Sequence, residues 1–207
     1  MAAEPSPQIA FHQQVDIVDV AIVGAGPAGM AAAVTARRHG ASVALLDEQL
    51  AAGGQIYRGV TAAPPERIHV LGPDYAIGAE LAREFAASGA HHITGAAVWQ
   101  VTPSHQVHYL QHGALRSVQA QRVLLCTGAM ERPFPIPGWT LPGVLTAGAA
   151  QILLKGSGMT PRLPVVLAGC GPLLYLLGWQ YVQAGVPIAA IVDTTEVTDL
   201  LRALWFA

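Results

Sequence analysis

The sequence predicts an α/β fold built from two Rossmann-like βαβ units, with a small antiparallel β insertion between them and a second unit that is cut short. An apolar run, a glycine-rich turn and a helix-length segment follow one another near residue 17 and again near residue 163. Three glycines and a proline of the first unit recur at one constant offset in the second, which indicates an internal duplication. The matched pairs are Gly24 and Gly169, Gly26 and Gly171, Pro27 and Pro172, and Gly40 and Gly185.

Composition and charge exclude several classes of protein. Of the 207 residues, 52% are hydrophobic and 12% are charged, which excludes global disorder. The net charge of −2 lacks the basic footprint of a nucleic-acid binder, so no nucleic-acid partner is expected. The 2 cysteines form no CxxC pair, which excludes a disulfide-stapled fold and a zinc ribbon.

The chain divides into four predicted segments. Residues 1–15 are expected to form a flexible polar tail without an export signal, which makes the cytoplasm the expected location. Residues 16–145 would form a first dinucleotide-binding domain, and residues 146–162 a connecting helix and linker. Residues 163–207 would form a partial second dinucleotide-binding domain.

The first unit follows the strand, turn, helix, strand order. Residues 17–23 are apolar and lead into the turn at residues 24–29, and a helix is expected over residues 27–39. Proline suits the first helical turn, and Gly40 supplies the stop before a strand that ends at Asp47.

Other elements are expected between and after the glycine turns. They are an amphipathic helix at 75–88, short strands at 96–101, 106–111 and 115–119, an apolar strand at 122–128, an extended proline-rich segment at 131–143, and a helix at 146–155 closed by Gly156. Residues 163–192 contain no Asp, Glu, Lys or Arg, but glycines and prolines break them into the segments of a buried βαβ unit. A transmembrane segment is therefore not expected.

The first glycine turn has the chemistry of a diphosphate-binding site. Gly24 permits the tight turn, Gly26 lets a diphosphate approach the backbone, and Gly29 lets helix and strand pack closely. The phosphates would then meet free N–H groups at the positive end of the helix. Asp47 lies close to the ~20-residue distance from the glycine turn that is expected of a ribose-binding acid, and it and its neighbour Glu48 are the candidates for ribose binding.

Three further motifs carry a family resemblance. The segments DEQ at 47–49, GGQIYR at 53–58 and LLCTGAMERPFPIPG at 124–138, together with the glycine turn, resemble the FAD-dependent pyridine-nucleotide-disulfide oxidoreductase superfamily. Within it they are most similar to the flavoprotein subunits of opine oxidase, hydrogen cyanide synthase and D-hydroxyproline dehydrogenase. The resemblance covers residues 17–193.

The resemblance implies FAD at the first unit. Gln55 would lie near the flavin, Val98 would offer its backbone to the adenine, and Thr127 and Gly128 would close over the cofactor. The diphosphate would be held at the glycine turn. The full set of implied cofactor-binding residues is Gly24, Gly26, Pro27, Ala28, Gly29, Asp47, Glu48, Gly54, Gln55, Val98, Thr127 and Gly128.

The chain departs from the superfamily in three ways. It lacks a redox cysteine pair, and Cys126 and Cys170 are expected to be structural thiols. Leu174 stands where a third glycine is expected, which disfavours NAD(P) binding through Gly169, Gly171 and Asp193; Asp193 itself would favour NAD over NADP. Relatives run longer, so we expect a fragment of a longer chain, a chain completed by a partner, or a remnant.

The leading functional hypothesis is a flavoprotein subunit of an amino-acid, opine or amine dehydrogenase. The resemblance implies a glycine-oxidase-like catalytic partner. Further options are a small iron–sulfur partner and association with the inner face of the membrane through the complex. No catalytic base is assigned, and no metal site is expected from the scattered histidines. Two alternatives stay open: a stand-alone NAD(P)H-dependent flavin reductase, and a truncated non-catalytic protein that no longer holds FAD.

Overall fold

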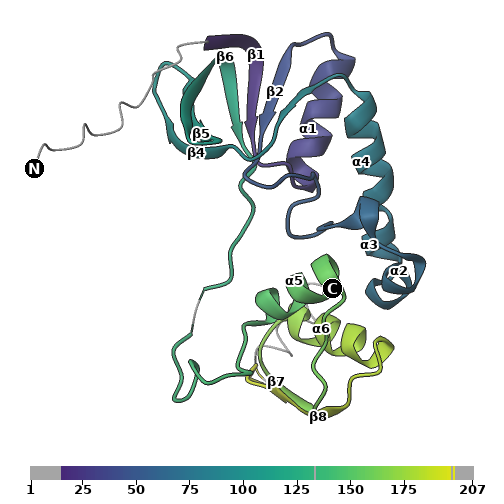
Figure 1. Ribbon diagram of the computed structural model, residues 1–207. Coiled ribbons are helices and arrows are strands. Elements are labelled where there is room, and N and C mark those ends of the chain that lie inside the picture. Colours follow the sequence, from purple (N-terminus) through teal and green to yellow (C-terminus); the bar gives the residue numbers. More distant parts are fainter. Residues whose placement is uncertain (1–14, 133, 197, 199–207) are drawn as a thin grey trace, which may run out of the picture. The chain divides into compact units, whose positions relative to one another are not determined.

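The computed structural model describes residues 15–132, 134–196 and 198. These residues belong to two compact units (Figure 1). The first unit includes residues up to Thr61 together with Ile77–Ala129, and the second includes Ala62–Ala76 and the chain from Met130 onwards. The expected tail at residues 1–15 lies outside the described residues except for Val15, and so do residues 199–207 of the expected second domain. The domain boundaries given by the sequence stay a prediction.

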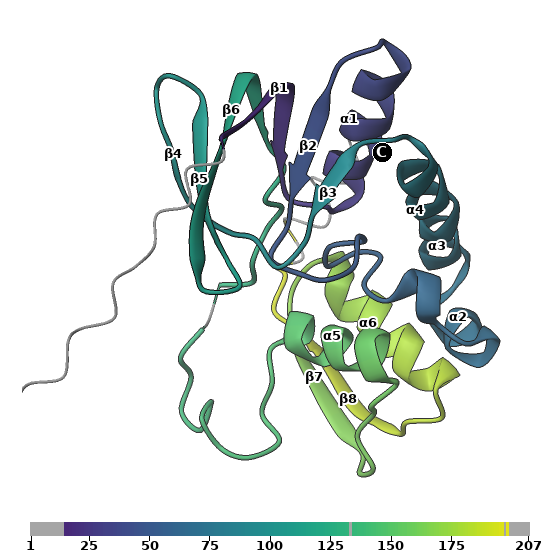
Figure 2. The ribbon, with the colours of Figure 1, turned by 45° about the horizontal axis from the view of Figure 1, so that its top comes forward.

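A six-stranded sheet in the order β3-β2-β1-β6-β5-β4 forms the first unit (Figure 2). The strands are β1 (Val15–Val23), β2 (Val43–Leu46), β3 (His91–Ile93), β4 (Ala97–Val101), β5 (Gln106–Gln111) and β6 (Ala114–Leu125). Strands β3, β2, β1 and β6 run parallel to one another, and β6, β5 and β4 are antiparallel neighbours. The predicted α/β class, with a Rossmann-like parallel sheet and an antiparallel insertion, is confirmed.

Strand β6 joins the parallel and antiparallel parts. Its first half pairs with β5, as in Val118 opposite Val107, and its pairing with β1 continues to Leu125 opposite Val23. The prediction of two separate strands at residues 115–119 and 122–128 is therefore wrong, because one ladder runs through both. The insertion is a continuation of the main sheet.

Two helices cover one face of this sheet (Figures 1 and 2). Helix α1 (Pro27–Arg38) has proline in its first turn and buries Met30, Ala33 and Val34. Helix α4 (Gly78–Ala87) packs beside α1 and buries Phe85. The expected helix at 75–88 is wrong in its start, because α4 begins only at Gly78 and the preceding residues form a separate short helix.

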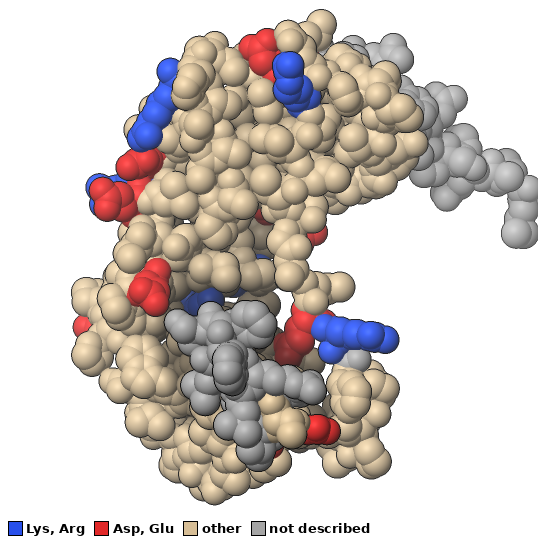
Figure 3. Space-filling view, turned by 180° about the vertical axis from the view of Figure 1, so that it is seen from behind, with Lys and Arg blue, Asp and Glu red and all other residues tan. Residues whose placement is uncertain are grey.

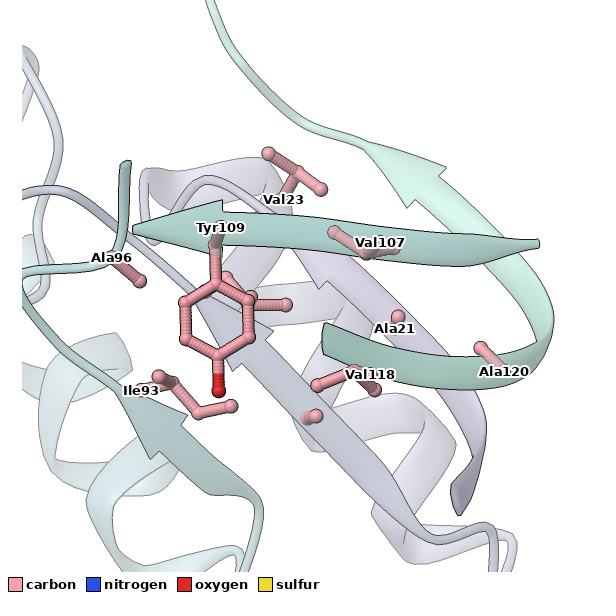
Figure 4. Packing of buried hydrophobic residues seen from close by; sticks show 10 residues of the cluster. Ala21, Val23, Ile93, Ala96, Val107, Tyr109, Val118 and Ala120 are labelled. Atoms are coloured by element: carbon pink, nitrogen blue, oxygen red, sulfur yellow. The ribbon is translucent and has the colours of Figure 1, made fainter. Parts of the chain in front are cut away.

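A buried apolar cluster fills the other face, where β4 and β5 fold over the parallel strands (Figure 4). Alternate residues along each parallel strand enter it, as the period of a β-strand requires. Tyr109 on β5 is 4% exposed and points toward Ile93. The members of the cluster are Ala21, Val23, Ala44, Leu46, Ile93, Ala96, Val107, Tyr109, Val118 and Ala120.

The second unit contains a pair of parallel strands, β7 (Val165–Gly169) and β8 (Ile188–Asp193), joined by α6 (Pro172–Gln183). Its other helices are α2 (Pro65–Leu71), α3 (Pro73–Ala76) and α5 (Ala147–Ser157). Gln180 on α6 donates from Nε2 to the carbonyl of Leu71 at 3.3 Å, which ties α6 to α2. Helix α5 ends at Ser157 and is capped by Gly158, whose φ is 70°; the expected stop, Gly156, remains helical.

The charge-free stretch forms the expected strand, helix, strand unit. Its helix α6 has 12 residues, and the helices of the described ranges are all too short or too polar to cross a membrane. Charged side chains are sparse on the face seen in Figure 3.

Changing Gly24 to alanine tests how the glycine turn is held. A Cβ there would lie 2.3 Å from the carbonyl oxygen of Cys126, and the φ of 104° is one that alanine rarely adopts. Gly113→Ala is the reference variant, because Gly113 also has a positive φ, 78°, but no described atom would contact its Cβ. We expect this variant to lower the free energy of unfolding by about 1–2 kcal/mol from backbone strain alone. Gly24→Ala should cost about 1–3 kcal/mol more through overpacking. Urea unfolding measures both, and equal losses would contradict the described contact.

Candidate functional site

A cavity of about 710 Å³ opens at the start of α1, next to the carboxyl ends of β1, β2 and β6. Its volume lies within the ~300–1,000 Å³ typical of ligand pockets. The lining residues are Val23, Gly24, Gly26, Pro27, Ala28, Leu46, Asp47, Glu48, Gln49, Gly54, Gln55, Ile56, Arg58, Ala96, Val98, Leu125, Cys126, Thr127, Gly128 and Ala129. Every residue that the sequence predicted for the first unit is in this lining except Gly29.

Gly29 does not line the cavity, but its lack of a side chain lets α1 pack against the end of β1. A Cβ on Gly29 would lie 1.9 Å from the carbonyl oxygen of Gly24, so any side chain would force the helix away from the strand. The first turn of α1 therefore sits tightly on the end of β1. Gly26, at φ −74°, lies at the N-terminus of α1, and its carbonyl accepts the first helical hydrogen bond from Met30 at 2.9 Å.

A second glycine-rich segment lies against the first. Gly53 donates its N–H to the carbonyl of Ala25 at 2.8 Å. A Cβ on Gly54 would lie 2.7 Å from Cα of Gly26, so two stretches of main chain touch with no side chain between them. The wall of the cavity at this point is bare backbone at the positive end of a helix, which is an environment that favours anions.

The two candidate acids differ in their surroundings. Asp47 accepts from the N–H of Ala25 at 2.5 Å through Oδ2 and from the N–H of Gln49 at 2.7 Å through Oδ1. Its carboxylate is thus fixed at the edge of the glycine turn. Glu48 is exposed, and its Oε1 accepts from the side chain of Gln49 at 3.3 Å. Both carboxylates line the cavity, but only Asp47 is held by main-chain donors.

The remaining predicted residues form the other walls. Val98 lies on β4 where the register with β5 shifts, and it is half-buried. Thr127 and Gly128 follow β6 and are exposed. Burial raises the pKa of the Cys126 thiol, so the thiol stays protonated at neutral pH and is a poor nucleophile.

Sequence reasoning missed two polar residues of this lining. Arg58 donates from Nη1 to Oε1 of Gln49 at 3.2 Å and from Nη2 to Oε1 of Gln55 at 3.3 Å. Gln49 and Arg58 both stand in motifs that the sequence made conspicuous, DEQ and GGQIYR. The signal was present in the motifs, but spacing alone does not say that residues 49 and 58 meet.

The second glycine turn differs from the first in three respects. Gly171 has a φ of 85°, where its counterpart Gly26 has −74°, and a Cβ on Gly169 would meet no atom of the described residues within 4 Å. Leu174, where a third glycine is expected, is buried at 6% exposure. The hydroxyl of Tyr175 donates to Asp193, and the hydrogen bonds from Thr195 and Tyr175 lower the pKa of that carboxyl. Asp193 thus accepts from a side-chain hydroxyl, whereas the donors described for Asp47 are main-chain N–H groups.

Metal ligands do not gather in the described ranges. No group of three or more His, Cys, Asp or Glu residues there has the geometry to hold a metal ion. His105 lies in the turn before β5 with a φ of 62°, while His108 on β5 stacks on Trp99 with ring centroids 5.4 Å apart.

Comparison with known proteins places this geometry in a family. Residues 18–170 match the family described as pyridine nucleotide-disulphide oxidoreductase. The chain is 51% identical over 189 residues to an opine oxidase subunit of Agrobacterium tumefaciens (strain Ach5), covering 87% of this chain and 38% of that relative. It is 36% identical over 189 residues to hydrogen cyanide synthase subunit HcnB of Pseudomonas aeruginosa, covering 87% and 39%. The chain thus spans less than half the length of these relatives.

A solved structure agrees on the fold. The structure of L-proline dehydrogenase from P. horikoshii is similar with a TM-score of 0.69 at 21% identity, covering 89% of this chain and 38% of that one. The resemblance inferred from the motifs is confirmed, because the family match spans most of the chain and includes both the glycine turn and GGQIYR. The chain belongs to the pyridine nucleotide-disulphide oxidoreductase family, whose members are oxidoreductases.

Proposed function

We propose that this chain binds FAD in the cavity at the start of α1 and serves in a flavoprotein subunit of an amino-acid, opine or amine dehydrogenase complex. The observation that carries the proposal is the contact between Gly26 and Gly54, which leaves bare main chain facing the cavity at a helix N-terminus. FAD, when bound, accepts and returns electrons, while the protein supplies its position and electrostatic surroundings.

Each part of FAD can be assigned to residues at or lining the cavity. The turn at Gly24, Gly26 and Gly29 would hold the diphosphate, with Pro27 and Ala28 offering the first helical turn. Asp47 would accept from a ribose hydroxyl, since its carboxylate is already positioned by two main-chain N–H groups. The rest of the cofactor would lie along walls that the sequence also predicted: Glu48, Gly54, Gln55, Val98, Thr127 and Gly128.

Partners are proposed from the relatives. The opine oxidase and hydrogen cyanide synthase relatives are, by name, subunits of larger enzymes. We propose a glycine-oxidase-like subunit that oxidises the substrate, with a small iron–sulfur protein as a further member of the complex. The protonated thiol of Cys126 and the separate position of Cys170, one in each unit, fit a role in electron transfer without thiol–disulfide exchange.

Titration of the purified chain with FAD tests the proposal. We expect a yellow protein that quenches flavin fluorescence, and we expect Gly26→Ala to weaken FAD binding by about tenfold or more. A Cβ at Gly26 meets only Gly54 Cα at 3.9 Å, an ordinary contact, so the fold should survive while the methyl group stands between the backbone and the diphosphate. Gly156→Ala, in α5 and outside the cavity lining, is the matched control. A protein that stays colourless with added FAD would instead support the truncated, non-catalytic alternative.

A second titration distinguishes the contributions of Asp47 and Glu48 to FAD binding. Asp47→Asn should weaken FAD binding by about tenfold and lower the thermal midpoint of the cofactor-free protein, because a charged acceptor of two main-chain N–H groups is lost. Glu48→Gln removes an exposed charge whose bond is to a neighbouring side chain, so its effect should stay within about threefold. Isothermal calorimetry measures both affinities, and the reverse order would assign the ribose to Glu48.

A stand-alone NAD(P)H-dependent flavin reductase is the second candidate, because the second unit repeats the strand, turn, helix, strand order and ends at Asp193. Leu174 and the hydrogen bond from Tyr175 to Asp193 both oppose binding of NAD(P) there. We therefore expect anaerobic NADH or NADPH to leave the flavin absorbance of the wild-type chain unchanged, while dithionite bleaches it. Rapid bleaching by NADH would establish the reductase.

A further inference from the structure

Among the described residues that line the cavity, Arg58 is the one with a positive side chain. The other charged groups of the lining are the carboxylates of Asp47 and Glu48. A dinucleotide adds two negative phosphates to that cavity, and the helix N-terminus supplies only about half a unit of positive charge. A guanidinium in the wall therefore has a large effect on whether an anion is held there.

The contacts of Arg58 fix its guanidinium on this wall. It donates to Oε1 of Gln49 at 3.2 Å and to Oε1 of Gln55 at 3.3 Å. A guanidinium can only donate, so both amides must turn their oxygens toward it.

The same segment is anchored against the glycine turn. Gly53 donates to Ala25, and Gly54 rests on Gly26, one residue before Gln55. At the far side, the ring of Tyr57 packs on Gly78 at the start of α4, where a Cβ would lie 2.2 Å from the ring. The segment that carries Arg58 is thus anchored at Gly53 and Gly54 on one side and at Tyr57 on the other, and Arg58 lines the same cavity as the glycine turn.

We propose that Arg58 binds the cofactor's diphosphate through its charge and holds the side chains of Gln49 and Gln55 in place on the same cavity wall. The inference rests on the proposed FAD site and deepens it. It assigns to the last residue of GGQIYR a role that the glycine turn does not explain, namely the counter-charge that a site with two carboxylates requires.

Matched variants measured with two ligands test the assignment. Arg58→Met removes the charge and keeps an unbranched apolar stem, and Arg58→Lys keeps the charge but loses the planar fork. Arg38→Met is the control, since it removes the same charge from an exposed ion pair with Glu84, and Arg38 does not line the cavity. Calorimetry gives the affinities for FAD and for ADP at low and high salt, and circular dichroism and thermal melting of the free protein report the fold.

We expect Arg58→Met to weaken both ligands by about tenfold or more at low salt, because each carries the diphosphate and a charge-assisted bond is lost. Arg58→Lys should lose about threefold, and Arg38→Met less than twofold, roughly the effect of an exposed charge. The difference between wild type and Arg58→Met should shrink as salt screens the charge.

Three results would overturn the assignment. Equal affinities for Arg58→Met and Arg38→Met would remove Arg58 from the site. Weakening of FAD without weakening of ADP would place Arg58 at the flavin and not at the diphosphate. Weakening that is independent of salt and accompanied by a lower melting temperature would show a structural role only. If Arg58→Met does not fold, Arg58→Lys decides, and wild-type affinity in that variant refutes the positioning role. If the wild type fails to bind FAD, the proposed function falls, while the ADP measurement still tests Arg58.

Discussion

The close packing of main chain at two glycine-bearing segments, residues 24–29 and 53–54, is the constraint on which the first unit depends. Gly29 must lack a side chain for α1 to reach the end of β1, and Gly54 must lack one for its segment to reach Gly26. Both contacts are between main chains, so no side chain rearrangement can relieve a substitution. Their consequence is a cavity wall of exposed backbone at the positive end of a helix, and the remaining walls follow from the strands that this packing brings together.

Sequence patterns predicted the parts of this arrangement that are local. The spacing of Gly24, Gly26 and Gly29 encodes the turn, and the position of Asp47 follows because one βαβ unit sets the distance between strand ends. Sequence alone could not show that β6 is continuous or that β3 exists, because long-range pairing with β1 and β2 decides both. Arg58 was missed because its partner Gln49 is nine residues away, in a loop that follows neither helix nor strand periodicity.

Family membership and cavity geometry give two independent kinds of information about the function. The match over residues 18–170 places the chain in an oxidoreductase family, and two of its relatives are by name enzyme subunits; this chain spans 38% of the length of the Agrobacterium opine oxidase relative. The structure adds two observations to the names: burial raises the pKa of the Cys126 thiol beside the cavity, and Cys170 belongs to the other unit. Both observations agree with the proposal that the described thiols take no part in the chemistry.

The duplicated glycine pattern shows that a repeated sequence motif does not guarantee a repeated backbone geometry. In the first unit, the carbonyl of Cys126 lies beside Gly24 and closes the turn from the β6 side; around Gly169 no described atom lies in the corresponding space. The second turn also takes a different backbone path at Gly171, and the buried Leu174 stands where the first unit has Gly29. Asp193 accepts from the side-chain hydroxyl of Tyr175, whereas the donors described for Asp47 are main-chain N–H groups. The inference of a diphosphate site in the first unit therefore rests on the neighbours of its glycines as much as on their spacing.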